Sequence, residues 1–92
     1  MIRSFKDRRT RQFFEGHRIA AFQQFAEQAA RRLTLLDNAE SLRDLSALRS
    51  NRLEALRGDR AGQYSIRINA QWRICFRWTE DGPGDVEIVD YH

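Results

Sequence analysis

The sequence predicts one α+β domain over residues 1–92, in which a short N-terminal strand and two helices pack on an antiparallel sheet of four or five strands. Three observations support this fold class. Apolar residues recur at steps of three and four between Ile19 and Leu36, which is the period of an amphipathic helix. Apolar and polar residues alternate over 63–69, 72–78 and 85–92, as they do in strands with one buried face. The connections between these strands are too short for parallel crossovers, so the strands must be antiparallel.

The start of the chain is expected to form a strand and then a short helix. Residues 1–5, "MIRSF", carry two apolar residues around a polar pair and predict the opening strand. Asp7 is suited to cap the N-terminus of a helix through "RRTRQFFE", and Gly16 is suited to end it. We expect both Phe13 and Phe14 to face the core.

The second helix is the strongest of the chain, because its apolar positions form one continuous face. These positions are Ile19, Phe22, Phe25, Ala26, Ala29, Leu33 and Leu36. Asn38 is expected to close this helix in the left-handed conformation. Ser41 and Asp44 then have the spacing of a capping box, which predicts a short helical turn. We expect its leucines to point one way: Leu42, Leu45 and Leu48.

The second half of the chain predicts the sheet. Residues 52–56 are a candidate strand, and "GDRAG" at 58–62 is a turn bounded by glycines. Ala70 and Gln71 make a tight connection between the next two strands, and "TEDGPG" makes another. One face of the sheet is apolar and receives the helices. The other face is expected to present polar side chains to solvent: Gln63, Ser65, Arg67, Asn69, Arg73 and Arg77.

The composition, with 41% hydrophobic and 32% charged residues, is typical of a globular protein. No window approaches the 18 apolar residues that a membrane span needs. Residues 1–10 lack the apolar region of a signal peptide. The single cysteine, Cys75, forms no internal disulfide, which fits a reducing compartment. We therefore expect a cytoplasmic protein that does not cross a membrane.

The charges are unevenly distributed along the chain. Residues 1–60 hold thirteen cations and eight anions, a net of +5, whereas residues 61–92 hold three cations and five anions, a net of −2. Fifteen of the 16 cations are arginine, whose planar guanidinium binds phosphate through two parallel hydrogen bonds. A basic body indicates a polyanionic partner such as nucleic acid. The alternative is an ordinary solvated surface.

Two arginines lie where a phosphate group can be held. Arg67 and Arg73 flank the predicted turn on adjacent strands, so their guanidinium groups can approach each other. Two unpaired guanidinium groups repel unless an anion lies between them, and the pair therefore resembles a phosphate clamp. Arg57 and Arg60, in the neighbouring "RGDR" turn, can extend it, although Asp59 can pair with either.

The chain ends in "DVEIVDYH", which combines a strand pattern with three functional side chains. Alternation places Asp90 and His92 on the core side and Tyr91 on the arginine side, unless the strand bends. Histidine exchanges protons near neutral pH, and a nearby carboxylate can orient it. Acid and base groups beside a cation cluster are what a metal-free ribonuclease needs, since one group takes the 2′-hydroxyl proton and another protonates the leaving 5′-oxygen.

Other chemistries lack the residues that they need. Two histidines and one cysteine give no metal-ligand spacing, so we expect no metal and no cofactor. There is no glycine-rich phosphate loop and no Ser-His-Asp arrangement. His17 lies in a turn between helices and is expected to decorate the surface.

The strings "IRSFKD", "RLEALRGDRAGQYSIRINAQWRICFRW" and "DVEIVDYH" together resemble the HigB toxins of the RelE/ParE superfamily, also called the plasmid maintenance system killer family. The resemblance covers essentially the whole chain. It implies a RelE-like fold and a bacterial, ribosome-dependent endoribonuclease. Such a toxin cuts mRNA in the ribosomal A site without a metal, leaves a 2′,3′-cyclic phosphate, and thereby inhibits translation and growth.

The resemblance also implies roles for individual residues. The terminal Asp90, Tyr91 and His92 match positions implicated in activity, and the arginine of "WRI" matches Arg73. The expected RNA or phosphate contacts are Lys6, Arg57, Arg60, Arg67 and Arg77.

Glu54 marks a departure from the family pattern, because some relatives carry a histidine at this place. A carboxylate can act as a base, but it is ionised at neutral pH and is a poor acid. A slower enzyme would then rely more on Tyr91 and His92 for proton transfer. Glu54 can equally pair with an arginine and do nothing chemical.

The implied partners are an antitoxin, the ribosome and mRNA. The antitoxin is expected to be of the HigA type, with a helix-turn-helix domain that binds operator DNA, in a complex of two toxins and two antitoxins. The 70S ribosome is expected to be contacted through its 16S rRNA. Two alternatives stay open: a DNA gyrase poison of the ParE type, because one fold hosts both activities, and a weakly active toxin that serves mainly as a co-repressor with its antitoxin.

Overall fold

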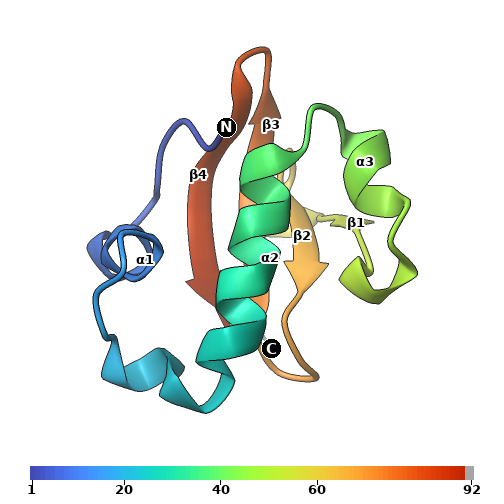
Figure 1. Ribbon diagram of the computed structural model, residues 1–92. Helices are drawn as coiled ribbons and strands as arrows, with labels where there is room; N and C mark the ends of the chain where they lie inside the picture. The colour runs from blue at the N-terminus through green and yellow to red at the C-terminus, as the bar shows by residue number, and fades with distance from the viewer. Residues whose placement is uncertain (91–92) are drawn as a thin grey trace.

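A four-stranded antiparallel sheet with helices on one face forms the structure, a computed structural model that describes residues 1–90 (Figure 1). The strands are β1 (Glu54–Ala55), β2 (Tyr64–Arg67), β3 (Arg73–Thr79) and β4 (Gly82–Val89), in the order β1-β2-β3-β4. The helices are α1 (Arg8–Phe14), α2 (Ala26–Asn38) and α3 (Leu42–Ser46). Three short 3₁₀ helices complete the chain: η1 (Ala20–Phe25), η2 (Arg49–Asn51) and η3 (Gly58–Arg60). The predicted α+β fold class is confirmed.

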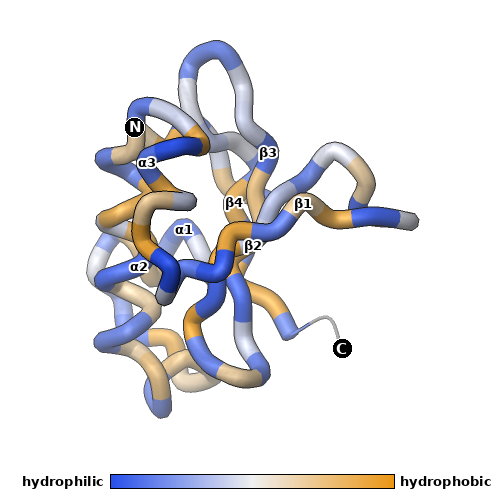
Figure 2. The backbone as a smooth tube through the Cα atoms, turned by 90° about the vertical axis from the view of Figure 1, so that its right-hand side faces the viewer, coloured by the Kyte–Doolittle hydropathy of each residue, from blue (hydrophilic) through white to orange (hydrophobic). Residues whose placement is uncertain are grey.

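The helices and the sheet form two layers, which the side view separates (Figure 2). The core lies between them and consists of apolar side chains from both: Phe22, Phe25, Ala29, Leu33, Leu36, Leu45, Ile66, Ile74, Phe76, Val86 and Ile88. The period-2 pattern of the second half thus identifies the inward face of the sheet correctly. The helices within residues 1–90 are all too short and too polar to cross a membrane.

The predicted N-terminal strand is the first expectation that the structure corrects. The segment runs parallel to β4, but only Phe5 forms a bridge, with Val86. Backbone bonds join it to β4: the Arg3 N–H donates to the Pro83 carbonyl at 2.8 Å, and the Lys6 N–H donates to the Val86 carbonyl at 3.0 Å. The segment 1–5 therefore contributes a single bridge beside β4 rather than a strand.

The first helix begins and ends where the sequence predicts. The Asp7 side chain accepts a hydrogen bond from the Thr10 N–H, and Gly16 follows the helix with φ at 103°. Phe13 packs against the core, but Phe14 is 38% exposed, so the prediction that both phenylalanines face inward is wrong for Phe14. A short helix has one buried side, and here Thr10 and Phe13 occupy it.

The predicted long helix is divided at Phe25. Residues Ala20–Phe25 form a 3₁₀ helix, and α2 begins at Ala26 after Phe25 leaves helical geometry with φ −129° and ψ 22°. The periodic apolar face is nevertheless correct. The prediction of a left-handed Asn38 is wrong, because Asn38 is the last residue of α2, and the chain leaves the helix at Ala39 in an extended conformation, φ −69° and ψ 133°.

The Ser41 cap of α3 is confirmed, since the Ser41 hydroxyl accepts from the Asp44 N–H, whereas the Asp44 carboxylate accepts from the Glu40 N–H rather than from that of Ser41. Leu45 is buried, but Leu48 is 44% exposed because α3 already ends at Ser46. The candidate strand at 52–56 is present as the two residues of β1.

The expectation that the polar face of the sheet is exposed to solvent is wrong for its centre. Gln63 is only 8% exposed and Ser65 is fully buried, as is Cys75 beside it. The reason is that arginine side chains from neighbouring elements lie over these residues, as described next. The alternation predicts which side of the sheet a residue occupies, and it does not predict what covers that side.

Candidate active site on the outer face of the sheet

The outer face of the sheet, opposite the helices, carries two rows of paired residues. The first row crosses all four strands, as Glu54 pairs with Ser65, Ser65 with Cys75, and Cys75 with Glu87. Side chains of directly paired residues point to the same face. The first row therefore has a carboxylate at each end and a hydroxyl and a thiol between them.

The second row consists of Arg67, Arg73 and Val89. Arg67 and Arg73 are Cα partners, so the sequence prediction that they flank one turn on adjacent strands is confirmed. The Arg73 guanidinium reaches back across β2, where Nη1 lies 3.4 Å from the Ser65 hydroxyl and 3.5 Å from the Arg52 carbonyl oxygen. Arg73 thereby links the two rows and places its positive charge above Ser65.

Arg60 is held over the first row by two acceptors. Its Nη1 donates to the Glu87 carboxylate at 3.1 Å and to the Gln63 side-chain carbonyl at 3.1 Å. The side chains of Arg60 and Glu87 are 23% and 17% exposed, so this pair is screened less than a surface ion pair. The Lys6 ammonium approaches the same Glu87 oxygen at 3.9 Å. Two of the predicted phosphate contacts, Lys6 and Arg60, therefore lie beside the same oxygen of Glu87.

Cys75 lies beneath these charged groups. Burial raises the pKa of its thiol from 9.0 to about 11, and the Arg60 guanidinium acts against that rise. The thiol is therefore neutral at physiological pH. A neutral, fully buried sulfur is a poor nucleophile, and Cys75 serves as filler, as the sequence indicated.

Glu54 lies on an edge strand and is exposed. Its position opposite Ser65 brings it to the row over which Arg73 extends. Within residues 1–90, no arginine forms an ion pair with Glu54. Its carboxylate therefore lies on the same face as the arginine cluster and, within residues 1–90, is not held in an ion pair with an arginine.

Two predicted phosphate contacts lie apart from this cluster. Arg77 is at the far end of β3, where Nε lies 3.6 Å from an Asp85 carboxylate oxygen and its guanidinium packs over Gly62. A β-carbon at Gly62 would lie 2.7 Å from Arg77 Nη1, so the tip of this arginine would have to shift, and the φ of 90° at Gly62 favours glycine in any case. Arg57 is exposed and immediately precedes η3. The structure therefore gathers Arg60, Arg67, Arg73 and Lys6 but not Arg57 and Arg77.

The C-terminal tail is held at its first functional residue. Strict alternation predicts Asp90 on the core side, but β4 ends at Val89 and Asp90 is exposed. The Gln71 side-chain amide donates to the Asp90 carboxylate at 2.7 Å. Gln71 itself lies in the turn between β2 and β3, which the Asn69 side chain stabilises by accepting from two backbone N–H groups at 2.8 Å. Tyr91 and His92 lie outside the described residues.

Sequence reasoning missed Glu87 and Gln71 as parts of this site. Glu87 had a usable signal, because it alternates with Val86 and Ile88 and therefore had to lie on the arginine side. For Gln71 the sequence offered no such signal, because a glutamine in a turn is common. His17, as expected, is exposed in the connection between α1 and η1. In the part of the chain that the structure describes, no three potential ligands gather that could hold a metal ion.

The chemistry that this arrangement supports is the binding of an anion. Guanidinium groups fixed by neighbouring acceptors offer directed hydrogen bonds to phosphate oxygens and stabilise negative charge that develops during a reaction. The cluster lies on the same side of the sheet as Glu54 and next to the tail that begins at Asp90.

Comparison with known proteins gives concordant results. A sequence model of the family described as "RelE-like toxin of type II toxin-antitoxin system HigB" matches residues 3–92. The chain is similar to Toxin HigB-1 of Vibrio cholerae serotype O1, at 36% identity over 95 residues that cover 100% of this chain and 98% of that protein. It is also similar to Endoribonuclease HigB of Proteus vulgaris, at 32% identity over 93 residues and 100% of both chains.

Among solved structures, the fold is similar to that of a chain in the YoeB-YefM complex from Staphylococcus aureus. The TM-score is 0.61 at 18% identity, over 100% of this chain and 98% of that one. At this identity the likeness establishes the fold alone.

Proposed function

The chain belongs to the HigB-like family, the RelE-like toxins of type II toxin–antitoxin systems, and from this premise we propose that it is an endoribonuclease that cuts mRNA on the ribosome. The observation that carries the proposal is the arginine cluster on the outer face, where Arg73 and Arg67 are paired across β2 and β3 and Arg60 lies over the next row. The full-length similarity to a relative named as an endoribonuclease supports the same activity.

The proposed reaction needs no metal. A base removes the proton of an RNA 2′-hydroxyl, the resulting oxygen attacks the adjacent phosphorus, and the bond to the 5′-oxygen breaks as an acid protonates that oxygen. The products are a 2′,3′-cyclic phosphate and a 5′-hydroxyl end. Arg73 and Arg67 stabilise the charge on the phosphoryl oxygens. Tyr91 and His92 are assigned the proton transfers, and Glu54 is a second candidate for the base.

Asp90 has a different role in this proposal. Its carboxylate is fixed by Gln71 at the start of the tail, so it orients the two residues that follow it in sequence. Arg60 is proposed to bind the RNA backbone beside the cut, with Glu87 and Gln63 holding its side chain across the sheet.

The experiment compares two arginine substitutions in a translating extract, one at the half-buried Arg73 and one at the exposed Arg31. Arg73→Ala is expected to reduce mRNA cleavage by at least about 100-fold, in line with the loss of one directed donor to the developing charge. Arg31→Ala is the matched control, because Arg31 is an exposed residue of α2, in the helical layer opposite the outer face, and pairs only with Glu27 among residues 1–90. Intact mRNA with wild-type protein, accompanied by trapped gyrase–DNA complexes, would overturn the proposal in favour of the ParE-type activity.

The proposed partner is an antitoxin of the HigA type, which neutralises the toxin and binds operator DNA through a helix-turn-helix domain. We expect a complex of two toxins and two antitoxins and a cytoplasmic location. Co-expression of the chain with the product of an adjacent gene, followed by mass measurement of the purified complex, tests both the partner and the stoichiometry.

A further inference from the structure

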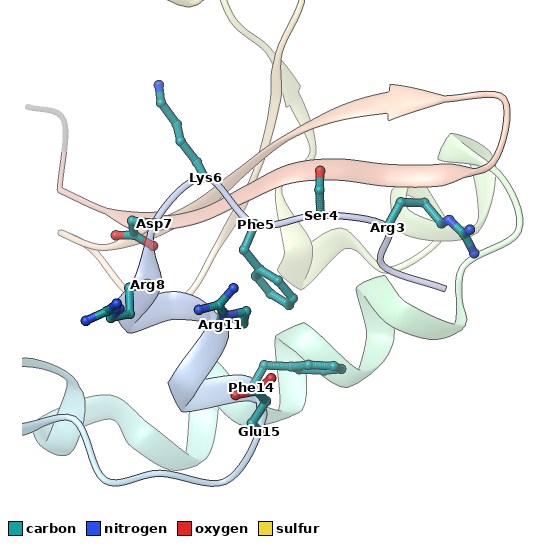
Figure 3. Close-up of a pocket in the computed structure, with 9 residues that line it drawn as sticks. All are labelled: Arg3, Ser4, Phe5, Lys6, Asp7, Arg8, Arg11, Phe14 and Glu15. Carbon is teal, nitrogen blue, oxygen red and sulfur yellow. The ribbon is translucent and has the colours of Figure 1, made fainter.

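We propose that a groove beside α1, on the edge of the molecule next to β4, binds one nucleotide of single-stranded RNA outside the cleavage site. This N-terminal groove lies between the segment 3–8 and the helix residues Arg11, Phe14 and Glu15 (Figure 3). Phe14 would stack on the base, and Arg8 and Arg11 would contact phosphate. The inference rests on the proposed function, since it adds a subsite to an RNA-cutting protein.

The groove has the size and the construction of a ligand site. Its volume is about 710 Å³, within the range of small-molecule pockets. Its walls are fixed to the sheet. The Ile88 N–H of β4 donates to the Thr10 hydroxyl of α1 at 3.0 Å, and Thr10 is fully buried. The opposite wall is the segment that the backbone bonds join to β4.

An exposed aromatic ring lies in this groove. Phe14 is 38% exposed, and its ring centroid lies 5.6 Å from that of Phe5 at an angle of 41°. Phe5 is partly buried against the core and supports Phe14 from behind. Aromatic side chains beside a basic groove are the usual platform for the bases of single-stranded nucleic acid.

Two arginines of α1 accompany this ring in the lining of the groove. Arg8, Arg11 and Phe14 follow one another at steps of three along the helix. In Figure 3, Arg11 projects toward Phe5, and Arg8 projects the other way from the start of α1. Within residues 1–90, neither arginine forms an ion pair. The nearby Asp7 is already engaged, because it caps α1 and lies 3.5 Å from Arg9. The lining holds four cations, Arg3, Lys6, Arg8 and Arg11, against the two carboxylates of Asp7 and Glu15, so the charge of the groove is positive.

Lys6 connects the groove to the candidate active site. It lines the groove, and its ammonium lies 3.9 Å from Glu87, a member of the first row on the outer face. Figure 3 shows its side chain projecting away from the side on which Arg8 and Arg11 lie. The basic surface thus turns around the edge of the sheet at β4. One RNA strand can follow it from Arg60, past Lys6, to Phe14. This continuity favours RNA over an acidic peptide.

The binding test uses a fluorescein-labelled oligouridine RNA. Phe14→Ala is expected to raise Kd about tenfold, whereas Phe14→Tyr, which keeps the stacking face, should bind within about twofold of wild type. Replacing Arg8 and Arg11 together by Ala should reduce the slope of log K against log salt by about 1.4, since each lost contact to single-stranded RNA accounts for about 0.7. Arg31→Ala is the control and should change neither quantity.

Unchanged Kd and salt slope in the Phe14 and Arg8/Arg11 variants would overturn the groove as an RNA site, whether or not the wild-type protein cuts mRNA. The same result with loss of antitoxin binding would assign the groove to a protein partner instead. Conversely, an inactive wild type with the expected binding changes would overturn the proposed function alone. Circular dichroism confirms that each variant is folded, and Phe14→Tyr tests the ring without removing packing.

Cross-linking distinguishes the two possible sources of the RNA. A photoreactive group at position 14 should attach to mRNA if the groove holds the strand that is being cut. Attachment to ribosomal RNA would keep the site and assign it to docking on the ribosome. Attachment only to ribosomal protein would contradict the proposal.

Discussion

At the scale of single residues, Gln71 is the partner of Asp90 that sequence reasoning did not identify, and we propose that it positions the tail. The hydrogen bond that its side-chain NH2 donates to the Asp90 carboxylate, at 2.7 Å, is exposed to solvent. A hydrogen bond of this kind contributes about 1 kcal/mol. Replacing Gln71 therefore should alter the orientation of the tail more than the stability of the fold.

We expect Gln71→Ala to lower kcat/KM for mRNA cleavage about three- to tenfold through kcat, and Gln71→Glu to lower it further, because a second carboxylate repels Asp90. The free energy of unfolding, from urea titration, should fall by no more than about 1 kcal/mol, the contribution of one hydrogen bond. Gln28→Ala, on the exposed side of α2, is the matched control. A Gln71→Glu variant with wild-type kcat would show that the bond to Asp90 does not position the tail.

Cys75 supports a prediction about pH. Burial raises the pKa of its thiol to about 11 in the folded chain, against 9.0 ordinarily. The folded state therefore keeps a proton that the unfolded state loses. The contribution of Cys75 to the free energy of unfolding is complete below pH 9 and is lost as the pH rises toward 11.

Comparison of wild type with Cys75→Ala by urea unfolding between pH 8 and 11 measures this effect. The wild type should lose more stability over that interval than the variant does. The native thiol should also react with a disulfide reagent only at the rate at which the protein opens. Rapid labelling of the native protein at pH 8 would contradict the burial of Cys75.

At the scale of secondary-structure elements, the N-terminal segment shows how glycine allows two parts of the chain to approach. Gly82 begins β4 with φ at 125°, and a β-carbon there would lie 2.6 Å from the Met1 carbonyl oxygen. Gly16 also has a positive φ, 103°, but nothing lies within 4 Å of its β-carbon position. An added β-carbon would therefore cause backbone strain alone at Gly16, but both backbone strain and a steric clash at Gly82.

We expect Gly16→Ala to destabilise the fold by about 1 kcal/mol through strain alone, and Gly82→Ala by about 2–4 kcal/mol, because the start of the chain must also move away from β4. The difference in the free energy of unfolding between the two variants measures the contact. Equal losses would mean that the segment 1–5 does not depend on its contact with Gly82.

The helices and strands follow from sequence to different extents. The period of 3.6 gave the buried positions of η1 and α2 correctly, but it could not reveal the break at Phe25, since a 3₁₀ turn and an α-helix bury nearly the same positions over six residues. The alternation over 85–89 placed Val86 and Ile88 correctly. The bulge in front of them, with Asp85 at a φ of 50°, was not visible in the pattern.

At the scale of the whole molecule, the layers and the antiparallel order were predictable because short connections leave few ways to pair the strands. The pairing of Arg67 with Arg73 followed from the same reasoning. The coverage of Gln63 and Ser65 did not, because it depends on long arginine side chains that reach over the sheet from η3 and β3. Alternation along one strand carries no information about such contacts.

The distribution of charge also belongs to this scale. The helical layer and the outer face both carry arginine, and Lys6 joins them at the edge of β4. A surface that is basic on two adjoining sides favours the binding of RNA, as the proposed function requires. The exposed groove beside α1 then becomes part of one continuous surface rather than a separate feature.

The most direct test of the proposed activity is to map the 5′ ends of mRNA in a translating extract after addition of wild-type, Arg73→Ala or Arg31→Ala protein. New 5′-hydroxyl ends within coding sequences should form with wild type and Arg31→Ala, only while translation continues, and should be reduced at least about 100-fold with Arg73→Ala. Equal cleavage by Arg73→Ala and wild type, or no cleavage by any of the three proteins, would contradict an RNA-cutting site on the outer face of the sheet.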